Sequence, residues 1–346
     1  MTEKPMRILS FGAGAVGTYI CGSLALQGQQ VVFLERPAVA QDLRQRGLRL
    51  ELVGQTHVIP APQVVGSIEE ALTLGPFDIS IFALKSFDTR PTLELIKPFL
   101  AQMPPVLCLQ NGVENEALLS SLLGADRVIA GTITSAIARR DAGDITLERR
   151  RGVGIAAGHP LSTRLVEAMT QAGLQTRLYP RAADMKWSKM LTNLLANATS
   201  AILDMTPAQI FAHPGLFRLE IFQLREALKV MQALSIQPVD LPATPVRMLA
   251  FSVRSLPLAI SRPLLIRAVG RGRGEKMPSF HIDLHSGRGQ SEVDYLNGAV
   301  ARFGDTCGVP TPVNRMLNKT LLDLTSGEIP ASFYAHQPEI LLRQVS

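Results

Sequence analysis

A short stretch near the start of the chain contains three glycines at close, regular intervals. Residues 11–17 read Phe-Gly-Ala-Gly-Ala-Val-Gly, after an apolar run at 6–10 and before a helix-compatible segment at 18–26. In such a G-x-G-x-x-G turn the first glycine permits the bend, the second lets backbone approach a pyrophosphate, and the third lets helix and strand pack closely. The predicted cofactor contacts in this turn are Gly12, Ala13, Gly14, Ala15, Val16 and Gly17.

The next segment supports this interpretation. A second apolar run at 31–34 ends in Glu35 and Arg36, about 20 positions after the glycines, where a Rossmann unit meets the adenosine ribose. A basic start followed by apolar residues is also typical of a secretory signal. The glycines at 12–22 and the lack of a small-residue cleavage site favour the strand instead.

A second group of polar residues recurs every four positions in the segment 184–203. Lys189, Asn193 and Asn197 would share one face of a continuous helix whose other positions are largely apolar. The stripe is either a solvated face or the polar wall of a cleft. Asparagine is a mediocre helix former and is therefore not typical of a solvated helix face, so the cleft wall stays an alternative.

Three further positions carry candidate groups. Ser291 and Asp294 have capping-box spacing, which places Glu292 in the first turn of a helix, where an acid stabilises the helix dipole. Lys85 and Asn111 follow the apolar runs 79–84 and 106–109. Polar residues at the carboxyl ends of parallel strands face the ligand crevice of an open α/β sheet, so both are candidate cofactor or substrate contacts.

The pattern of elements predicts two domains in the 346 residues. Apolar runs alternate with amphipathic segments up to about residue 130, and short β-prone pieces at 132–157 predict hairpins that close the edge of the sheet. After residue 180 the pattern is helical. We therefore expect an α/β protein with an N-terminal Rossmann-type, doubly wound sheet at 1–180, an all-α C-terminal domain at 181–346 and substrate bound in the cleft between them.

The excess positive charge is confined to one segment. Residues 247–276 contain seven of the 35 basic residues but only one of the 29 acidic residues, so basic and acidic residues are equal in number in the rest of the chain. The seven basic residues of this segment are Arg247, Arg254, Arg262, Arg267, Arg271, Arg273 and Lys276. Such a patch attracts an anionic substrate, a phosphate or a membrane surface. With a single aromatic residue in this window, base stacking on nucleic acid is poorly supported.

The composition also limits the class of protein to which the chain can belong. The three cysteines, Cys21, Cys108 and Cys307, are far apart, which predicts free thiols in a reducing cytoplasm. His281 and His285 have no third ligand nearby, so no metal is expected, and no apolar run is long enough for a membrane span. The expected partner is a small molecule rather than nucleic acid or a membrane; a homodimer is compatible with the sequence.

Taken together, the motifs resemble the ketopantoate reductase (2-dehydropantoate 2-reductase) family almost from end to end. The matching blocks are 12–17, 84–86, 110–113, 131–132, 138–143, 187–197, 278–279 and 291–298. The resemblance implies NADPH-dependent reduction of ketopantoate to pantoate, a step of pantothenate and coenzyme A biosynthesis.

The family resemblance also implies roles for single residues. Lys189 would be the general acid and Glu292 its partner; Asn111, Asn193, Asn197 and Ser279 would bind the substrate. A ketone that receives hydride gains charge on oxygen, which a buried ammonium group can stabilise and protonate. Arg36 matches the family position for a 2′-phosphate and favours NADPH, whereas Glu35 suits the free 2′-hydroxyl of NADH.

Two alternatives remain. The segment 238–277 is longer than the family core requires and predicts broken helices that could change the substrate pocket, so the chain could reduce another branched or larger 2-oxo acid. A non-catalytic NADP-binding sensor is the alternative from another class; it would need neither Lys189 nor Glu292.

Overall fold

The computed structural model describes residues 4–272 and 276–345, except for the side chains of residues 264, 268–272 and 345. It divides into two units: one runs to Lys186 and includes Leu241–Thr244, and the other contains Trp187–Asp240 and the chain from Pro245 onward. Helix α7 (Ala182–Leu194) carries the chain from the first unit to the second. The Arg271 and Arg273 side chains of the basic segment lie outside the described residues.

The first unit is built on an eight-stranded sheet with the order β12-β11-β8-β7-β6-β1-β2-β5. All neighbouring strands are parallel except β8 and β11, which are antiparallel. The strands are β1 (Arg7–Phe11), β2 (Gln30–Leu34), β5 (Gln63–Val65), β6 (Ile79–Phe82), β7 (Val106–Cys108), β8 (Val128–Ile133), β11 (Val153–Ala156) and β12 (Thr176–Tyr179). Their near-continuous apolar composition is typical of parallel strands buried on both faces.

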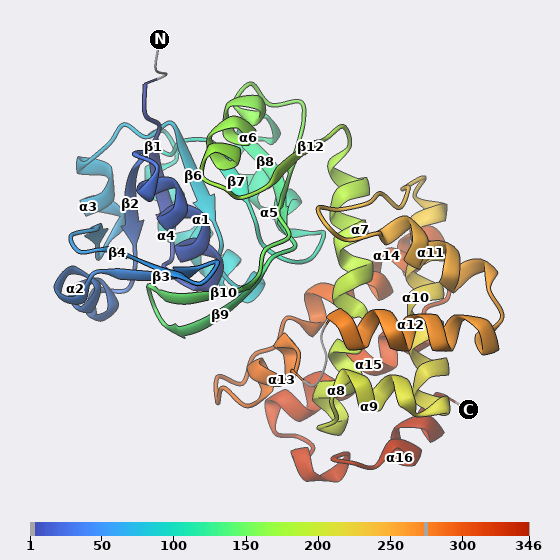
Figure 1. Cartoon of the computed structure of the whole chain (residues 1–346). Helices are drawn as coiled ribbons and strands as arrows, with labels where there is room; N and C mark the ends of the chain where they lie inside the picture. The colour runs from blue at the N-terminus through green and yellow to red at the C-terminus, as the bar shows by residue number, and fades with distance from the viewer. Residues whose placement is uncertain (1–3, 273–275, 346) are drawn as a thin grey trace. The chain divides into compact units, whose positions relative to one another are not determined.

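Helices cover both faces of this sheet (Figure 1). Ile8 belongs to the core shared with α1 (Ala15–Leu26) and α6 (Ser162–Gln171), and its neighbour Leu9 belongs to the core on the opposite face. Successive side chains of a strand point to opposite faces, which explains this division. The second core is shared with α3 (Ile68–Thr73), α4 (Thr89–Ile96) and α5 (Asn115–Leu123).

A second, four-stranded sheet corrects the prediction for residues 132–157. The hairpin of β9 (Ala136–Asp141) and β10 (Asp144–Arg149) does not close the main sheet; it joins β3 (Leu48–Leu52) and β4 (Gln55–Ile59) in the order β4-β3-β10-β9. This sheet packs on α1, where a Cβ on Gly22 would lie 2.7 Å from the Leu50 side chain. Helix α2 (Pro37–Arg46) connects β2 to β3.

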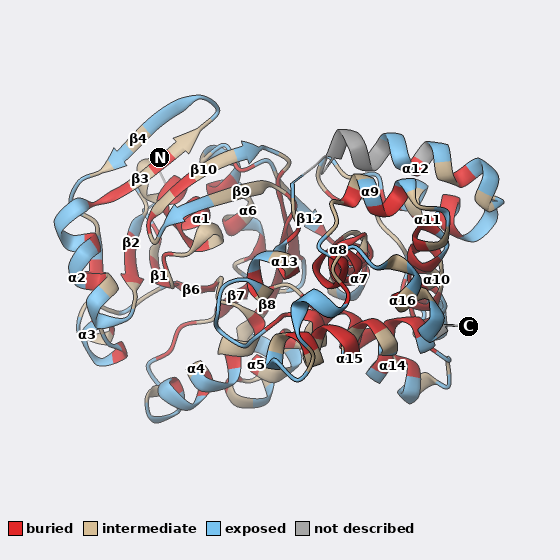
Figure 2. Cartoon of the chain, turned by 90° about the horizontal axis from the view of Figure 1, so that it is seen from below, coloured by how far each residue is buried: buried red, intermediate tan, exposed pale blue. Residues whose placement is uncertain are grey.

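The second unit is helical in its described part. Helix α10 (Pro214–Ala233) packs against α9, α11, α14, α15 and α16 and buries residues on most of its length. Figure 2 shows α8 in the buried colour, in agreement with the burial of all its residues. The other elements are α8 (Asn197–Leu203), α9 (Pro207–Ala212), α11 (Val246–Ser255), α12 (Leu258–Gly272), α13 (Ser279–Leu284), the π-helical turn η4 (Asp294–Gly298), α14 (Ala299–Cys307), α15 (Pro312–Ser326) and α16 (Pro338–Leu342).

The basic segment 238–277 contains two helices, α11 and α12, separated at Leu256 and Pro257. The prediction of interrupted helices is therefore confirmed for its described residues. None of the helices in the described ranges is both long and apolar enough to cross a membrane.

Candidate active site in two units

The glycine turn has the geometry expected for a phosphate cradle. Gly12 has φ +91°, which favours glycine, and a Cβ on Gly17 would lie 2.3 Å from the Gly12 carbonyl oxygen. The position of a Cβ on Gly14 has no atom within 4 Å, so space for a ligand is open at the start of α1. The first turn of α1 has neither an acidic residue nor a capping side chain, and its backbone N–H groups therefore suit a pyrophosphate.

Glu35 and Arg36 follow β2 beside this turn. The Glu35 carboxylate accepts hydrogen bonds from the backbone N–H of Ala13 at 2.6 Å and of Arg36 at 3.2 Å. The Arg36 side chain is exposed at the start of α2. In this arrangement the acid is directed to the glycine turn, and the guanidinium group extends from the same strand end.

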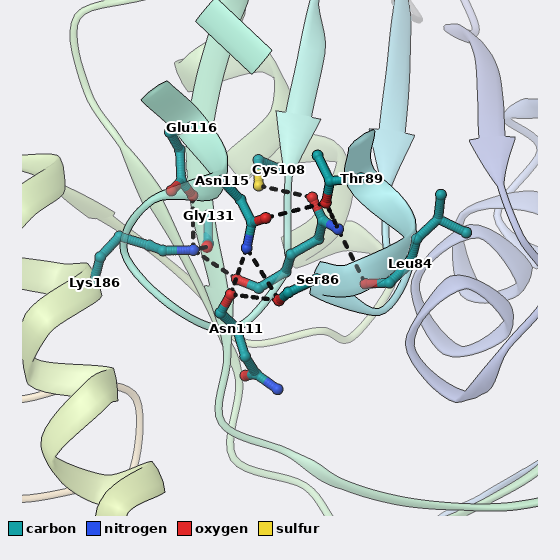
Figure 3. A network of polar contacts seen from close by, with 10 residues as sticks. Leu84, Ser86, Thr89, Cys108, Asn111, Asn115, Glu116, Gly131 and Lys186 are labelled. Atoms are coloured by element: carbon teal, nitrogen blue, oxygen red, sulfur yellow. Dashed lines mark hydrogen bonds and ion pairs between the residues drawn. The ribbon is translucent and has the colours of Figure 1, made fainter. Parts of the chain in front are cut away.

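The loops after β6 and β7 are joined by a buried polar network (Figure 3). The Gln110 side-chain amide donates to the carbonyl oxygens of Leu84 and Lys85, both at 3.3 Å, and to Thr89 Oγ1 at 2.8 Å. The Asn115 amide donates to Ser86 Oγ and to the Asn111 carbonyl oxygen, at 3.1 and 2.7 Å.

This network holds the backbone of two predicted cofactor contacts, Lys85 and Asn111. Lys85 and Asn111 both offer a main-chain carbonyl to it. Figure 3 shows the Asn111 side chain pointing away from the network. The two loops at the carboxyl ends of neighbouring strands are therefore held as one piece.

Lys186 anchors the same region from the first turns of α7. Its ammonium group lies 2.7 Å from Glu116 Oε1, and it donates to the carbonyl oxygens of Gln110 at 2.6 Å and Gly131 at 3.3 Å. Burial alone would lower the pKa of Lys186, but the Glu116 carboxylate outweighs this and raises the pKa above its usual value. The buried lysine is therefore charged and paired.

In the second unit, the predicted continuous helix over 184–203 is wrong. Helix α7 ends at Leu194 and α8 begins at Asn197, because Ala196 adopts the left-handed conformation with φ +48°. Lys189 and Asn193 still lie one turn apart on α7, but Asn197 is not the next position of the same stripe. Lys189 is half-buried, whereas Asn193 and Asn197 are buried, which excludes a fully solvated face.

The break brings Asn197 to the start of α13. Its Oδ1 accepts from the backbone N–H of Phe280 at 3.1 Å, and its Nδ2 donates to Ser279 Oγ at 3.4 Å. Two predicted substrate residues that are 82 positions apart in the chain are thus in contact. Ser279 itself is exposed.

Glu292 lies just before η4 and is 2% exposed. The predicted capping box is wrong: Ser291 Oγ accepts from the Val293 N–H, and the Asp294 carboxylate pairs with Arg302 at 2.9 Å instead of supporting a cap. The chain reaches α14 through a π-helical turn. A contact between Glu292 and Lys189 stays a prediction.

The sequence interpretation missed two side chains of α10 that contact the break. Glu220 accepts from the Ala196 N–H at 2.7 Å and from Thr199 Oγ1 at 2.6 Å, and Gln223 Nε2 donates to the Leu194 carbonyl oxygen at 3.2 Å. The available signal was a glutamate between Leu219 and Ile221 in an amphipathic helix.

None of the three cysteines, all of which lie in the described residues, forms a disulfide. Cys21, Cys108 and Cys307 are free thiols, the first two of them buried. Within the described residues no group of three potential ligands could hold a metal ion. His281 pairs with Asp204 at 2.8 Å.

An α/β unit with an open glycine turn, followed by a helical unit, is the architecture of a class of dinucleotide-dependent oxidoreductases. Residues 8–158 match the family model described as ketopantoate reductase PanE/ApbA, and residues 181–324 match its C-terminal counterpart. The chain belongs to the ketopantoate reductase family, whose members are nicotinamide-dependent oxidoreductases. The predicted family, fold class and enzyme class are confirmed.

Individual relatives cover nearly the whole chain. A 2-dehydropantoate 2-reductase of Mesorhizobium japonicum is 28% identical over 335 residues, 89% of this chain and 94% of the relative. One from Pyrococcus horikoshii is 26% identical, over 90% of this chain and 95% of the relative. The crystal structure of a PanE/ApbA family ketopantoate reductase from Ralstonia eutropha has a TM-score of 0.79 at 27% identity, covering 93% of this chain and 99% of that one.

Proposed function

We propose that this chain reduces 2-dehydropantoate (ketopantoate) to pantoate with NADPH as the hydride donor. The observation that carries the proposal is the near full-length similarity to proteins named 2-dehydropantoate 2-reductase. The open glycine turn at Gly14 supports dinucleotide binding, and the free cysteines agree with a reducing, cytoplasmic location.

The second unit supplies the groups for the reaction. A nicotinamide dinucleotide held by the first unit would supply the hydride for the carbonyl carbon. Lys189 stabilises the negative charge that develops on the carbonyl oxygen as the hydride arrives, and gives that oxygen its proton. Glu292 favours the charged form of Lys189, because an opposite charge nearby stabilises an ammonium group. Asn193, Asn197 and Ser279 bind the substrate through neutral hydrogen bonds, which orient it without adding charge.

The first unit supplies the groups for the cofactor. Backbone N–H groups at the start of α1 bind the pyrophosphate, and Lys85 and Asn111 contact the dinucleotide from the joined loops. Arg36 binds the 2′-phosphate, because a guanidinium fork matches phosphate geometry. The neighbouring Glu35 carboxylate, which accepts from the Ala13 N–H, is the group that would suit the free 2′-hydroxyl of NADH.

The test is oxidation of NADPH by the purified protein with 2-dehydropantoate, NADH and a panel of other 2-oxo acids. Turnover should be fastest with NADPH and 2-dehydropantoate and should fall about 100-fold or more in Lys189→Ala. Lys319→Ala, on an exposed lysine of α15, is the matched control and should retain full activity.

Other outcomes would revise the proposal. Turnover of another 2-oxo acid alone would keep the mechanism and direct attention to residues 238–277. Dinucleotide binding without turnover of any 2-oxo acid would favour the sensor.

A further inference from the structure

The break between α7 and α8 is held by side chains of a different helix. At a helix break, the carbonyl groups of one segment and the N–H groups of the next lose their partners. Here the Ala196 N–H donates to Glu220 Oε2, and the Leu194 carbonyl oxygen accepts from Gln223 Nε2. Two side chains one turn apart on α10 therefore replace the missing main-chain bonds on both sides of the break.

Glu220 is a buried carboxylate that accepts hydrogen bonds from three donors. It is 0% exposed and accepts from the Ala196 N–H, from Thr199 Oγ1, and from Gln223 Nε2 at 2.6 Å. A buried carboxylate is retained without large cost only where such hydrogen bonds stabilise it. Two of these donors, the Ala196 N–H and Thr199 Oγ1, lie at the break, and the third, Gln223, itself binds the Leu194 carbonyl oxygen, so these bonds connect Glu220 to the break from both sides.

The break decides where the Asn197 side chain points. In a continuous helix, Asn197 would follow Asn193 on the same face. With Ala196 left-handed, Asn197 starts α8 and contacts Ser279 and the Phe280 N–H instead.

We propose that Glu220 and Gln223 are positioning residues for substrate binding: they hold the left-handed turn at Ala196 and thereby keep Asn197 against Ser279. This inference rests on the proposed function, in which Asn197 and Ser279 bind the 2-oxo acid. Neither α10 residue needs to touch the substrate.

The kinetic test compares Glu220→Leu, Glu220→Gln and the control Glu226→Gln. Glu226 is another buried acid of α10, but it caps α15 through the Val313 and Asn314 N–H groups. Glu220→Leu should raise the KM for 2-dehydropantoate about tenfold, because the substrate would lose about one hydrogen bond to the protein. Glu220→Gln should raise it less, because its amide oxygen can still accept from Ala196, and Glu226→Gln should leave it unchanged.

A measurement of NADPH binding distinguishes a misplaced Asn197 from a general loss of folded protein. The Kd for NADPH, measured by fluorescence, should be the same in all three variants, because the cofactor contacts lie in the first unit. A fall in kcat with unchanged substrate KM in Glu220→Leu would overturn the inference, since it would report fewer active molecules rather than a misplaced Asn197.

Hydrogen–deuterium exchange tests the same inference without turnover. Peptides covering residues 194–199 should exchange faster in Glu220→Leu and in Gln223→Met than in the wild type or Glu226→Gln. Unchanged protection in both variants would overturn the positioning role. If the wild type fails to reduce 2-dehydropantoate, the proposed function is wrong, whereas exchange still decides whether Glu220 and Gln223 hold the break.

Discussion

The ammonium group of Lys186 lies 2.7 Å from the Glu116 carboxylate, and the Lys186 side chain is 5% exposed. It also binds the carbonyl oxygens of Gln110 and Gly131, on or next to two neighbouring strands. The pair therefore ties the start of α7 to the loop that carries Asn111. Removing one partner of such a pair leaves a poorly solvated charge.

Lys186→Met should lower the free energy of unfolding by about 3 kcal/mol, because the Glu116 carboxylate loses its cation. Urea unfolding followed by circular dichroism measures this. The control is Lys319→Met, which removes an exposed lysine paired with Asp323 at 2.6 Å and should change stability little. Equal effects of the two substitutions would show that the Lys186 pair is not specially stabilising.

Ala196→Gly should leave stability unchanged or raise it by up to about 1 kcal/mol, because glycine adopts the left-handed conformation without the steric cost of a Cβ. In an uninterrupted helix the same substitution would cost about 1 kcal/mol. Urea unfolding measures whether the substitution raises or lowers the free energy of unfolding. Ala198→Gly, two residues later inside α8, should be destabilising and serves as the reference.

Arg36→Ala should raise the KM for NADPH about tenfold or more, because a charge-assisted bond to the 2′-phosphate contributes about 1.5–3 kcal/mol. The KM for NADH, which lacks that phosphate, should change little. Steady-state kinetics with both dinucleotides measures the ratio. Similar changes for the two cofactors would remove Arg36 from 2′-phosphate binding.

Glu226 should make stability depend on pH. Burial raises the pKa of this carboxyl above its usual value, although hydrogen bonds from Asn314 and Val313 oppose the shift. The folded state therefore binds the proton more tightly than the unfolded state, whose pKa is about 4.3. By linkage, stability falls as pH rises from the unfolded to the folded pKa.

The measurement is the difference in unfolding free energy between the wild type and Glu226→Gln across that pH range. Glutamine does not titrate, so the stability of the wild type relative to the variant should decrease as pH rises. A constant or increasing difference would contradict the direction of the pKa shift.

In native protein, a thiol reagent should modify Cys307 and leave Cys21 and Cys108 unreacted. Burial raises the pKa of Cys21 to about 12 and raises that of Cys108 as well, so neither forms the reactive thiolate near neutral pH. Ellman titration before and after unfolding in guanidinium should count one thiol and then all three. Rapid reaction of Cys108 in the folded state would show that the core around β7 opens.

The sequence by itself determined the features that depend on neighbouring residues. The turn at Gly12 and Gly17 could be predicted because φ and close packing restrict the residue type within one strand–turn–helix unit. The alternation of apolar strands and helices predicted the α/β unit, and the helical pattern after residue 180 predicted the helical one. The family could be identified because its motifs recur in order along the chain.

Only the tertiary structure decided the features that depend on distant residues. Local propensity over 184–203 favours one helix, but Glu220 and Gln223 accept and donate the bonds that a break at Ala196 requires. Likewise, β10 pairs with β3, about 95 positions earlier, rather than with the edge of the main sheet. Hydrogen-bond partners so far apart in the chain leave no periodic signal, because their match arises only when the elements pack.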